Sequence, residues 1–129
     1  MTIPPETRTT ILLLVSDAVV RAVMQEILEH EGYVVLAVGE LGQAVDRLKD
    51  TAPELLITRT YVRDLPGHEA AKYLRTKCNK MKVLLVGGLL ADDRLEYRAK
   101  LEHFEVFPKP YPASEFVHKV REVLSEPRG

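Results

Sequence analysis

Cysteine is almost missing from this sequence of 129 residues, and Cys78 is its one example. A single cysteine excludes an intramolecular disulfide framework and a zinc site built from several cysteines. It favours a reducing compartment, so we expect a cytoplasmic protein. Long Pro-, Gly- or Ser-rich linkers are also missing, which predicts one domain over residues 10–125, a flexible segment over 1–9, and a tail or linker stub over 126–129.

An excess of charge of either sign is missing too. The 18 Lys and Arg residues balance 19 Asp and Glu residues, which leaves a formal net charge of −1. This balance argues against a domain that binds nucleic acid or an anionic membrane through bulk charge. The apolar runs are shorter than the ~18–20 residues that a membrane-spanning helix needs, so we expect no membrane contact.

Short apolar runs alternating with amphipathic segments are what the sequence does contain. The apolar runs cover residues 11–15, 33–38, 55–58, 83–86 and 106–107. Runs that are apolar on both sides suit strands of a parallel sheet that is covered on both faces. Apolar residues recur at helical spacing over residues 19–28, 41–48, 70–74, 95–101 and 116–124. Gly32 is expected to end the first of these helices, and Ser16 and Asp17 to cap its start.

Five strands that alternate with five helices through short connections predict right-handed crossovers onto a parallel sheet. We therefore expect an α/β, doubly wound, flavodoxin-like fold: a five-stranded parallel sheet between two helical layers. In this class, sites form where the strands end, near the switch in strand order. The strand ends read Val15-Ser16-Asp17, Thr58-Arg59-Thr60, Gly87-Gly88 and Lys109-Pro110.

Several motifs occur in an order that resembles the receiver domain of bacterial response regulators. They are the apolar run 11–15 before a helix with Arg21, the tripeptide Glu31-Gly32-Tyr33, the segment 53–57, Gly67 eight residues after Arg59, and the tripeptide Lys109-Pro110-Tyr111. The resemblance spans about residues 10–124. It implies a receiver-like fold and a role in a two-component phosphorelay.

The resembled family transfers a phosphoryl group from a histidine kinase to an aspartate. The chemistry uses an acidic pair after the first strand to hold Mg²⁺, and an aspartate nucleophile after the third. In an alignment without gaps, the acidic pair falls on Val15 and Ser16. With a one-residue deletion it falls on Ser16 and Asp17, so at most one carboxylate of the pair remains. The nucleophile position holds Arg59, whose protonated guanidinium is no nucleophile and repels Mg²⁺.

The family's remaining positions differ as well. Gly87 replaces a Ser or Thr after the fourth strand, and Val106 replaces an aromatic switch residue. Lys109 alone matches, and Pro110 after it is the candidate for the cis bond common in the family. The resemblance therefore implies a vestigial phosphorylation pocket of Val15, Ser16, Asp17, Arg59, Gly87 and Lys109. We expect no cofactor, lost or very weak Mg²⁺ binding, and no catalysis.

The first interpretation is a pseudo-receiver: a non-enzymatic signalling module that acts by protein contact without aspartyl phosphorylation. The resemblance places the contact or self-association surface on the fourth helix, fifth strand and fifth helix. The residues expected on that face are Arg94, Tyr97, Arg98, Glu102, Phe104, Val106 and Lys119.

Two other interpretations stay open. The altered pocket around Arg59 and Lys109, with Asp17 as counter-ion, could serve as an anion or small-molecule sensor. Alternatively, the domain is a phospho-accepting receiver with displaced acids, with Glu54 and Asp64 the nearest carboxylates. The four histidines fall on different predicted elements without the spacing of metal ligands, and we expect them to be solvated: His30, His68, His103 and His118.

Overall fold

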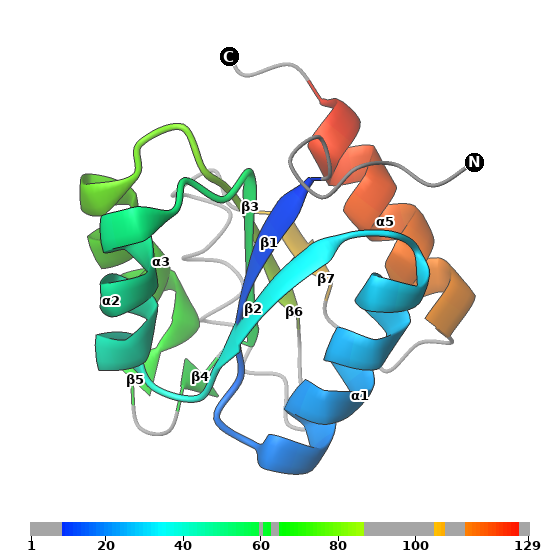
Figure 1. Ribbon diagram of the computed structural model, residues 1–129, viewed down its shortest axis with the longest axis horizontal. Coiled ribbons are helices and arrows are strands. Elements are labelled where there is room, and N and C mark those ends of the chain that lie inside the picture. Colours follow the sequence, from blue (N-terminus) through cyan, green and yellow to red (C-terminus); the bar gives the residue numbers. More distant parts are fainter. Residues whose placement is uncertain (1–8, 60, 63–64, 87–104, 108–112, 127–129) are drawn as a thin grey trace.

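The computed structural model describes residues 9–59, 61–62, 65–86, 105–107 and 113–126. Its main sheet is parallel throughout and has the strand order β2-β1-β3-β6-β7 (Figure 1). The strands are β1 (Thr10–Leu14), β2 (Val34–Val38), β3 (Leu55–Arg59), β6 (Lys82–Val86) and the short β7 (Glu105–Phe107). The predicted parallel α/β sheet is confirmed.

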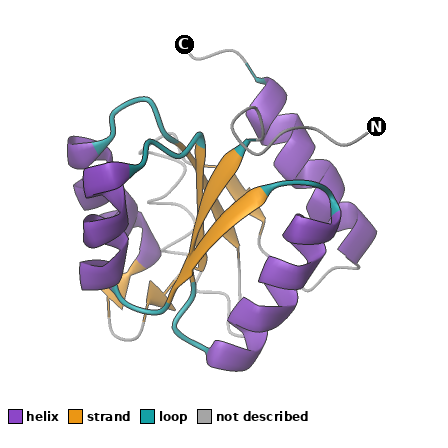
Figure 2. Ribbon diagram, in the orientation of Figure 1, coloured by secondary structure: helices purple, strands orange, loops and turns teal. Residues whose placement is uncertain are grey.

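Helices cover both faces of this sheet. They are α1 (Ala18–His30), α2 (Leu41–Asp50), α3 (Gly67–Lys77) and α5 (Ala113–Ser125). Figure 2 shows α1 and α5 on one face and α2 and α3 on the other, which is the expected layer arrangement. The described part of the chain thus holds four helices rather than five, because the predicted helix over 95–101 lies outside it. None of the described helices has the length and apolar character to cross a membrane.

Burial explains why the strands are apolar along their whole length. In β1, Ile11 and Leu13 pack on the side of α1 and α5, while Leu12 and Leu14 pack on the side of α2 and α3. All four of these side chains are fully buried. Alternate residues of a strand point to opposite faces, so a sheet between two helical layers needs apolar residues at every position.

Two segments differ from the sequence-based prediction. The sequence pattern predicted no strand or helix between residues 58 and 70, but Tyr61–Val62 (β4) and Leu65–Pro66 (β5) form a small antiparallel pair. Val62 is buried against the core on the α2–α3 side, which anchors this pair. The helical spacing predicted a third helix over residues 70–74, but α3 has 11 residues, since it begins directly after Pro66 and continues to Lys77.

The ends of α1 follow the prediction. Asp17 is its N-cap residue, and Gly32, just past its end, has a φ of 95°. Only glycine adopts this left-handed conformation without strain, and the N–H of Gly32 closes the last turn by donating to the carbonyl oxygen of Glu29 at 3.0 Å.

Candidate functional site

The carboxyl ends of β1, β3 and β6 meet at one edge of the sheet. Leu14 pairs with Thr58 across β1 and β3, so Val15, the next residue, lies beside Arg59. On the other side, Arg59 pairs with Val86, the last residue of β6. The register therefore places Arg59 between two neighbouring strand ends, where the fold class positions its sites.

Val15 is a core residue at this edge. Its side chain is 1% exposed and packs with the cluster between the sheet and the α1–α5 layer. Its backbone N–H donates to the carbonyl oxygen of Val38 at 3.1 Å, which extends the pairing of β1 with β2. The position contributes apolar volume and no side-chain oxygen, and Ser16 beside it is half-buried.

The carboxylate of Asp17 is engaged by α1. Its Oδ1 accepts hydrogen bonds from the backbone N–H groups of Val19 at 2.9 Å and Val20 at 3.0 Å. This satisfies two of the N–H groups that a helix leaves without intrahelical partners. The expected cap is confirmed, whereas among the described residues no ion pair joins Asp17 to Arg59.

Arg59 is half-buried at the end of β3. Within the described residues its guanidinium has no hydrogen bond or ion pair. The residue before it, Thr58, is fully buried, and its hydroxyl donates to the carbonyl oxygen of Leu14 at 2.7 Å. Thr58 therefore fastens β3 to β1 one position before the site, a role that the sequence pattern did not reveal.

A second arginine supports the same edge from α1. Nη1 of Arg21 donates to the carbonyl oxygen of Val15 at 2.8 Å. A Cβ atom at Gly39 would lie 2.7 Å from this nitrogen, so the glycine makes room for the guanidinium. The N–H of Gly39 donates in turn to Oε1 of Gln43 at 3.0 Å. Sequence reasoning noted Arg21 only as part of a motif, because its contact with Gly39 joins distant segments.

These residues do not fit a divalent cation. Mg²⁺ prefers several oxygen ligands in octahedral geometry. The described residues of the predicted pocket offer one carboxylate, that of Asp17, which already caps α1. They also offer the hydroxyl of Ser16 and the cationic side chain of Arg59. Across the described ranges, no group of three or more His, Cys, Asp or Glu residues is placed to hold a metal ion.

Many of the residues predicted to be functional lie outside the described ranges. They are Gly87 and Lys109 of the pocket, the cis-bond candidate Pro110, the nearby carboxylate Asp64, and Arg94, Tyr97, Arg98, Glu102 and Phe104 of the contact surface. His103, which was expected to be solvated, also lies outside these ranges. Val106 lies in β7, where its backbone pairs with Leu85 of β6. Lys119 lies in α5 with its Nζ 3.2 Å from Oε1 of Glu122.

One histidine is not solvated as expected. His68 is 3% exposed in the first turn of α3, with its Nε2 3.2 Å from Oε1 of Glu69. The first two residues of α3 are both buried, which removes the imidazole from water. His30 and His118 are exposed, as predicted.

Comparison with known proteins identifies the relatives of this chain. The family model described as "Response regulator receiver domain" matches residues 11–121. A CheY-like receiver domain protein from Methanospirillum hungatei JF-1 is 21% identical with a TM-score of 0.81, over 92% of this chain and 94% of that one. The non-phosphorylated HemR receiver domain from Leptospira biflexa is 22% identical with a TM-score of 0.80, over 95% and 98%.

A third similar structure holds a metal. The receiver domain of the sensor histidine kinase PA1611 from Pseudomonas aeruginosa PAO1, solved with a magnesium ion in its active site cleft, is 19% identical with a TM-score of 0.75. The match covers 93% of this chain and 100% of that one. No curated protein matches this chain. At these identities the structures establish a shared fold.

Proposed function

The chain belongs to the response regulator receiver domain family, and we propose that it is a pseudo-receiver, a two-component signalling module that works without aspartyl phosphorylation. The observation that carries the proposal is Arg59 at the end of β3, between the ends of β1 and β6. The family's nucleophile belongs at this position, and a guanidinium cannot form an acyl phosphate.

The electrostatics of the edge support the same proposal. A phosphoryl donor reaches a receiver as a dianion with Mg²⁺, and the metal needs carboxylates. Arg59 adds a positive charge where the metal would bind, and Val15 replaces an acid with buried apolar volume. The remaining acid, Asp17, already accepts two hydrogen bonds from α1. We therefore propose that Mg²⁺ binding is lost or very weak and that the domain is not an enzyme.

An intact-mass measurement tests the proposal. The full chain is incubated with acetyl phosphate and Mg²⁺, and an active receiver domain in a parallel reaction verifies the donor. We expect no phosphoryl adduct on this chain. A stoichiometric adduct would overturn the proposal, and the variants Asp17→Asn, Glu54→Gln and Asp64→Asn would then identify which displaced carboxylate accepts the phosphoryl group.

The proposed output is contact with a partner protein in the cytoplasm, through the surface of the fourth helix, fifth strand and fifth helix. Aromatic residues among mixed charges are typical of protein interfaces. We expect Tyr97→Glu and Phe104→Glu to weaken capture of the partner from a lysate. Retained capture by both variants would move the contact elsewhere on the domain.

A second candidate function rests on the charge of Arg59. This half-buried guanidinium has no anionic partner among the described residues, since Asp17 caps α1. Together with Lys109 it would bind an anion, as a sensor rather than a contact module. Phosphate or sulfate is then expected to raise the melting temperature of the wild type but not of Arg59→Ala. Equal shifts in both proteins would exclude this candidate.

A further inference from the structure

A cavity lies at the carboxyl end of β2, the strand at one edge of the main sheet. Figure 1 shows that α1 and α2 both begin at this end of the sheet. The cavity has a volume of about 310 Å³. The residues that line it are Arg21 of α1, Ala37, Val38 and Gly39 at the strand end, and Gln43, Asp46 and Arg47 of α2. Three of its four polar side chains therefore carry N–H donors.

The guanidinium of Arg21 has donors to spare. Of its five N–H groups, one bonds to the carbonyl oxygen of Val15 at 2.8 Å, and the described residues supply no second partner. Gly39 leaves room for the guanidinium beside the cavity, because a Cβ atom there would lie 2.7 Å from Nη1. The Arg21 side chain is half-buried, so water screens its charge less than that of a fully exposed arginine.

Two side chains of α2 add further donors. Gln43 and Arg47 lie one helical turn apart and both line the cavity. Oε1 of Gln43 accepts the N–H of Gly39 at 3.0 Å, which leaves the side-chain NH₂ group of Gln43 as a donor. Among the described residues the guanidinium of Arg47 has no hydrogen bond or ion pair. The cavity therefore offers an amide and two guanidinium groups to an acceptor.

The acid among the lining residues does not cancel this charge. Oδ1 of Asp46 lies 3.3 Å from Nζ of Lys49, and the Asp46 side chain is 72% exposed. Lys49 balances the charge of Asp46, and water and salt screen an exposed pair of this kind. The two arginines therefore leave the cavity with a net positive charge.

We propose that this α1–α2 cavity, defined by the residues that line it, binds a phosphate group without forming a covalent bond to it. Its donors come from two helices and two sides. A tetrahedral phosphate presents oxygen acceptors in all directions, whereas a carboxylate presents two in one plane. The fork of a guanidinium also matches the spacing of phosphate oxygens. The ligand class is inorganic phosphate or the phosphate monoester of a small molecule.

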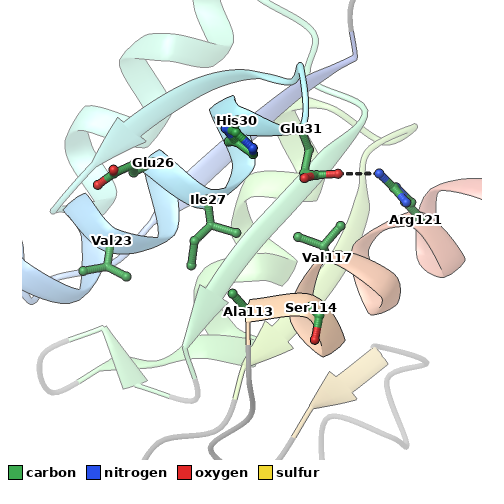
Figure 3. Close-up of a pocket in the computed structure, with 9 residues that line it drawn as sticks. All are labelled: Val23, Glu26, Ile27, His30, Glu31, Ala113, Ser114, Val117 and Arg121. Carbon is green, nitrogen blue, oxygen red and sulfur yellow. Dashed lines mark hydrogen bonds and ion pairs between the residues drawn. The ribbon is translucent and has the colours of Figure 1, made fainter.

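The larger groove between α1 and α5 does not share these properties. It has a volume of about 500 Å³, and Figure 3 shows the apolar side chains of Val23, Ile27 and Val117 along it. Its one guanidinium, that of Arg121, is paired with the carboxylate of Glu31. An anion there would compete with a carboxylate that is already in place, so we expect phosphate to bind the α1–α2 cavity instead.

This inference goes beyond the proposed function, because it needs no phosphoacceptor. It also uses none of the residues of the anion candidate around Arg59 and Lys109. The proposals can fail separately: a covalent phosphoryl adduct would overturn the pseudo-receiver and leave the cavity unaffected. Stabilisation by phosphate that persists in Arg59→Ala but is lost in Arg47→Gln would belong to the cavity.

An amide NMR titration of the full chain with inorganic phosphate, at an ionic strength held constant with chloride, tests the inference. We expect saturable shifts of the Gly39 backbone amide and the Gln43 side-chain amide. Gln43→Glu keeps the acceptor for the N–H of Gly39 but replaces the NH₂ donors with a negative charge. We therefore expect it to weaken phosphate binding at least about tenfold.

Substitutions of charged residues separate a site from a general effect of charge. Arg47→Gln is expected to weaken phosphate binding about fivefold, because Arg47 is exposed. Arg75→Gln, which removes the same charge from α3 outside the cavity, is its matched control and is expected to change nothing. Asp46→Asn is expected to tighten binding about twofold, and Asp50→Asn, an exposed acid of α2 that does not line the cavity, is not.

Two results would overturn the inference. One is the absence of saturable shifts at Gly39, or their replacement by shifts confined to Ser16 and Arg59. The other is an equal affinity for phosphate in the wild type, Gln43→Glu and Arg47→Gln. A parallel titration with glycerol 3-phosphate identifies the source of the phosphate group. Tighter binding than that of inorganic phosphate indicates a phosphate monoester, and equal binding indicates free phosphate.

Discussion

The middle of β1 and β3 and the carboxyl ends of the same strands follow different rules. In the middle, Ile11–Leu14 and Leu55–Ile57 are fully buried between two helical layers. At the ends, Val15 follows directly after β1, and Arg59 is the last residue of β3. Burial requires apolar side chains of about the right total volume, which several combinations of residues can supply. Phosphoryl transfer requires particular oxygen atoms at particular positions. The fold can therefore persist when the end residues no longer suit the chemistry.

The sharpest test of this contrast compares two substitutions in β3. Leu56→Ala empties part of the core on the α2–α3 side, so we expect a loss of ~2–5 kcal/mol in the free energy of unfolding. Arg59→Ala, three residues later, is expected to change it by about 1 kcal/mol or less. Urea denaturation measures both. Similar losses would mean that the Arg59 guanidinium is part of the structural framework.

At the opposite edge of the sheet, where the strands begin, a cation has a structural role. Lys82, at the start of β6, donates through Nζ to the carbonyl oxygens of Val123 at 3.1 Å, Leu124 at 2.9 Å and Glu126. A cation there satisfies the last carbonyls of α5 and its dipole. We expect Lys82→Met to cost ~1–2 kcal/mol of unfolding free energy.

Amide hydrogen exchange identifies the origin of that loss. In Lys82→Met, exchange is expected to accelerate in the last turn of α5 and to stay unchanged in α2. The exposed Lys80 provides the matched control, Lys80→Met. A uniform acceleration in both helices, or an equal effect of Lys80→Met, would contradict the capping role of Lys82.

The hydroxyl of Thr58 connects the core to the site. Because it donates to the carbonyl oxygen of Leu14 while fully buried, Thr58→Val is expected to lower the free energy of unfolding by ~1 kcal/mol. Thr58→Ser keeps the hydroxyl and serves as the control for the hydrogen bond. If the serine variant loses as much stability as the valine variant, the methyl group of Thr58 contributes more than its hydroxyl.

The smallest effect concerns Asp17. Its role as N-cap predicts a loss of ~1 kcal/mol for Asp17→Ala and a smaller loss for Asp17→Ser, which retains a capping oxygen. If Asp17 caps the helix and binds no metal, the stability lost in Asp17→Ala is the same with and without Mg²⁺. The melting temperatures of the wild type and of Asp17→Ala, each in Mg²⁺ and in EDTA, measure this loss. A loss that is larger in Mg²⁺ would show that Asp17 holds the ion.

Local patterns predicted much of this molecule. The continuous apolar run of β1 indicated a strand covered on both faces, and Asp17 and Gly32 marked the two ends of α1. These signals lie within a few residues of the structure that they specify. The sequence also predicted that the strand ends lie at one edge of the sheet, because parallel strands finish on the same side.

Contacts between distant segments were not predictable in the same way. The burial of His68 depends on how α3 packs, and the pairing of β4 with β5 depends on Val62 reaching the core. The contact of Arg21 with Val15 requires the space that Gly39 leaves. Likewise, the groove between α1 and α5 joins residues from the two ends of the chain. Each of these features needs the three-dimensional arrangement of elements that sequence periodicity does not specify.

The loss of aspartyl phosphorylation is tested most simply by an amide NMR titration of the full chain, first with Mg²⁺ and then with Mg²⁺ and beryllofluoride. Beryllofluoride mimics a phosphoryl group on an aspartate. The pseudo-receiver proposal predicts no saturable shifts at Ser16, Asp17 or Arg59, or at the residues around Lys109. Saturable shifts confined to those residues would contradict it, because they would mean that a working phosphorylation site has been rebuilt at the edge where Arg59 stands.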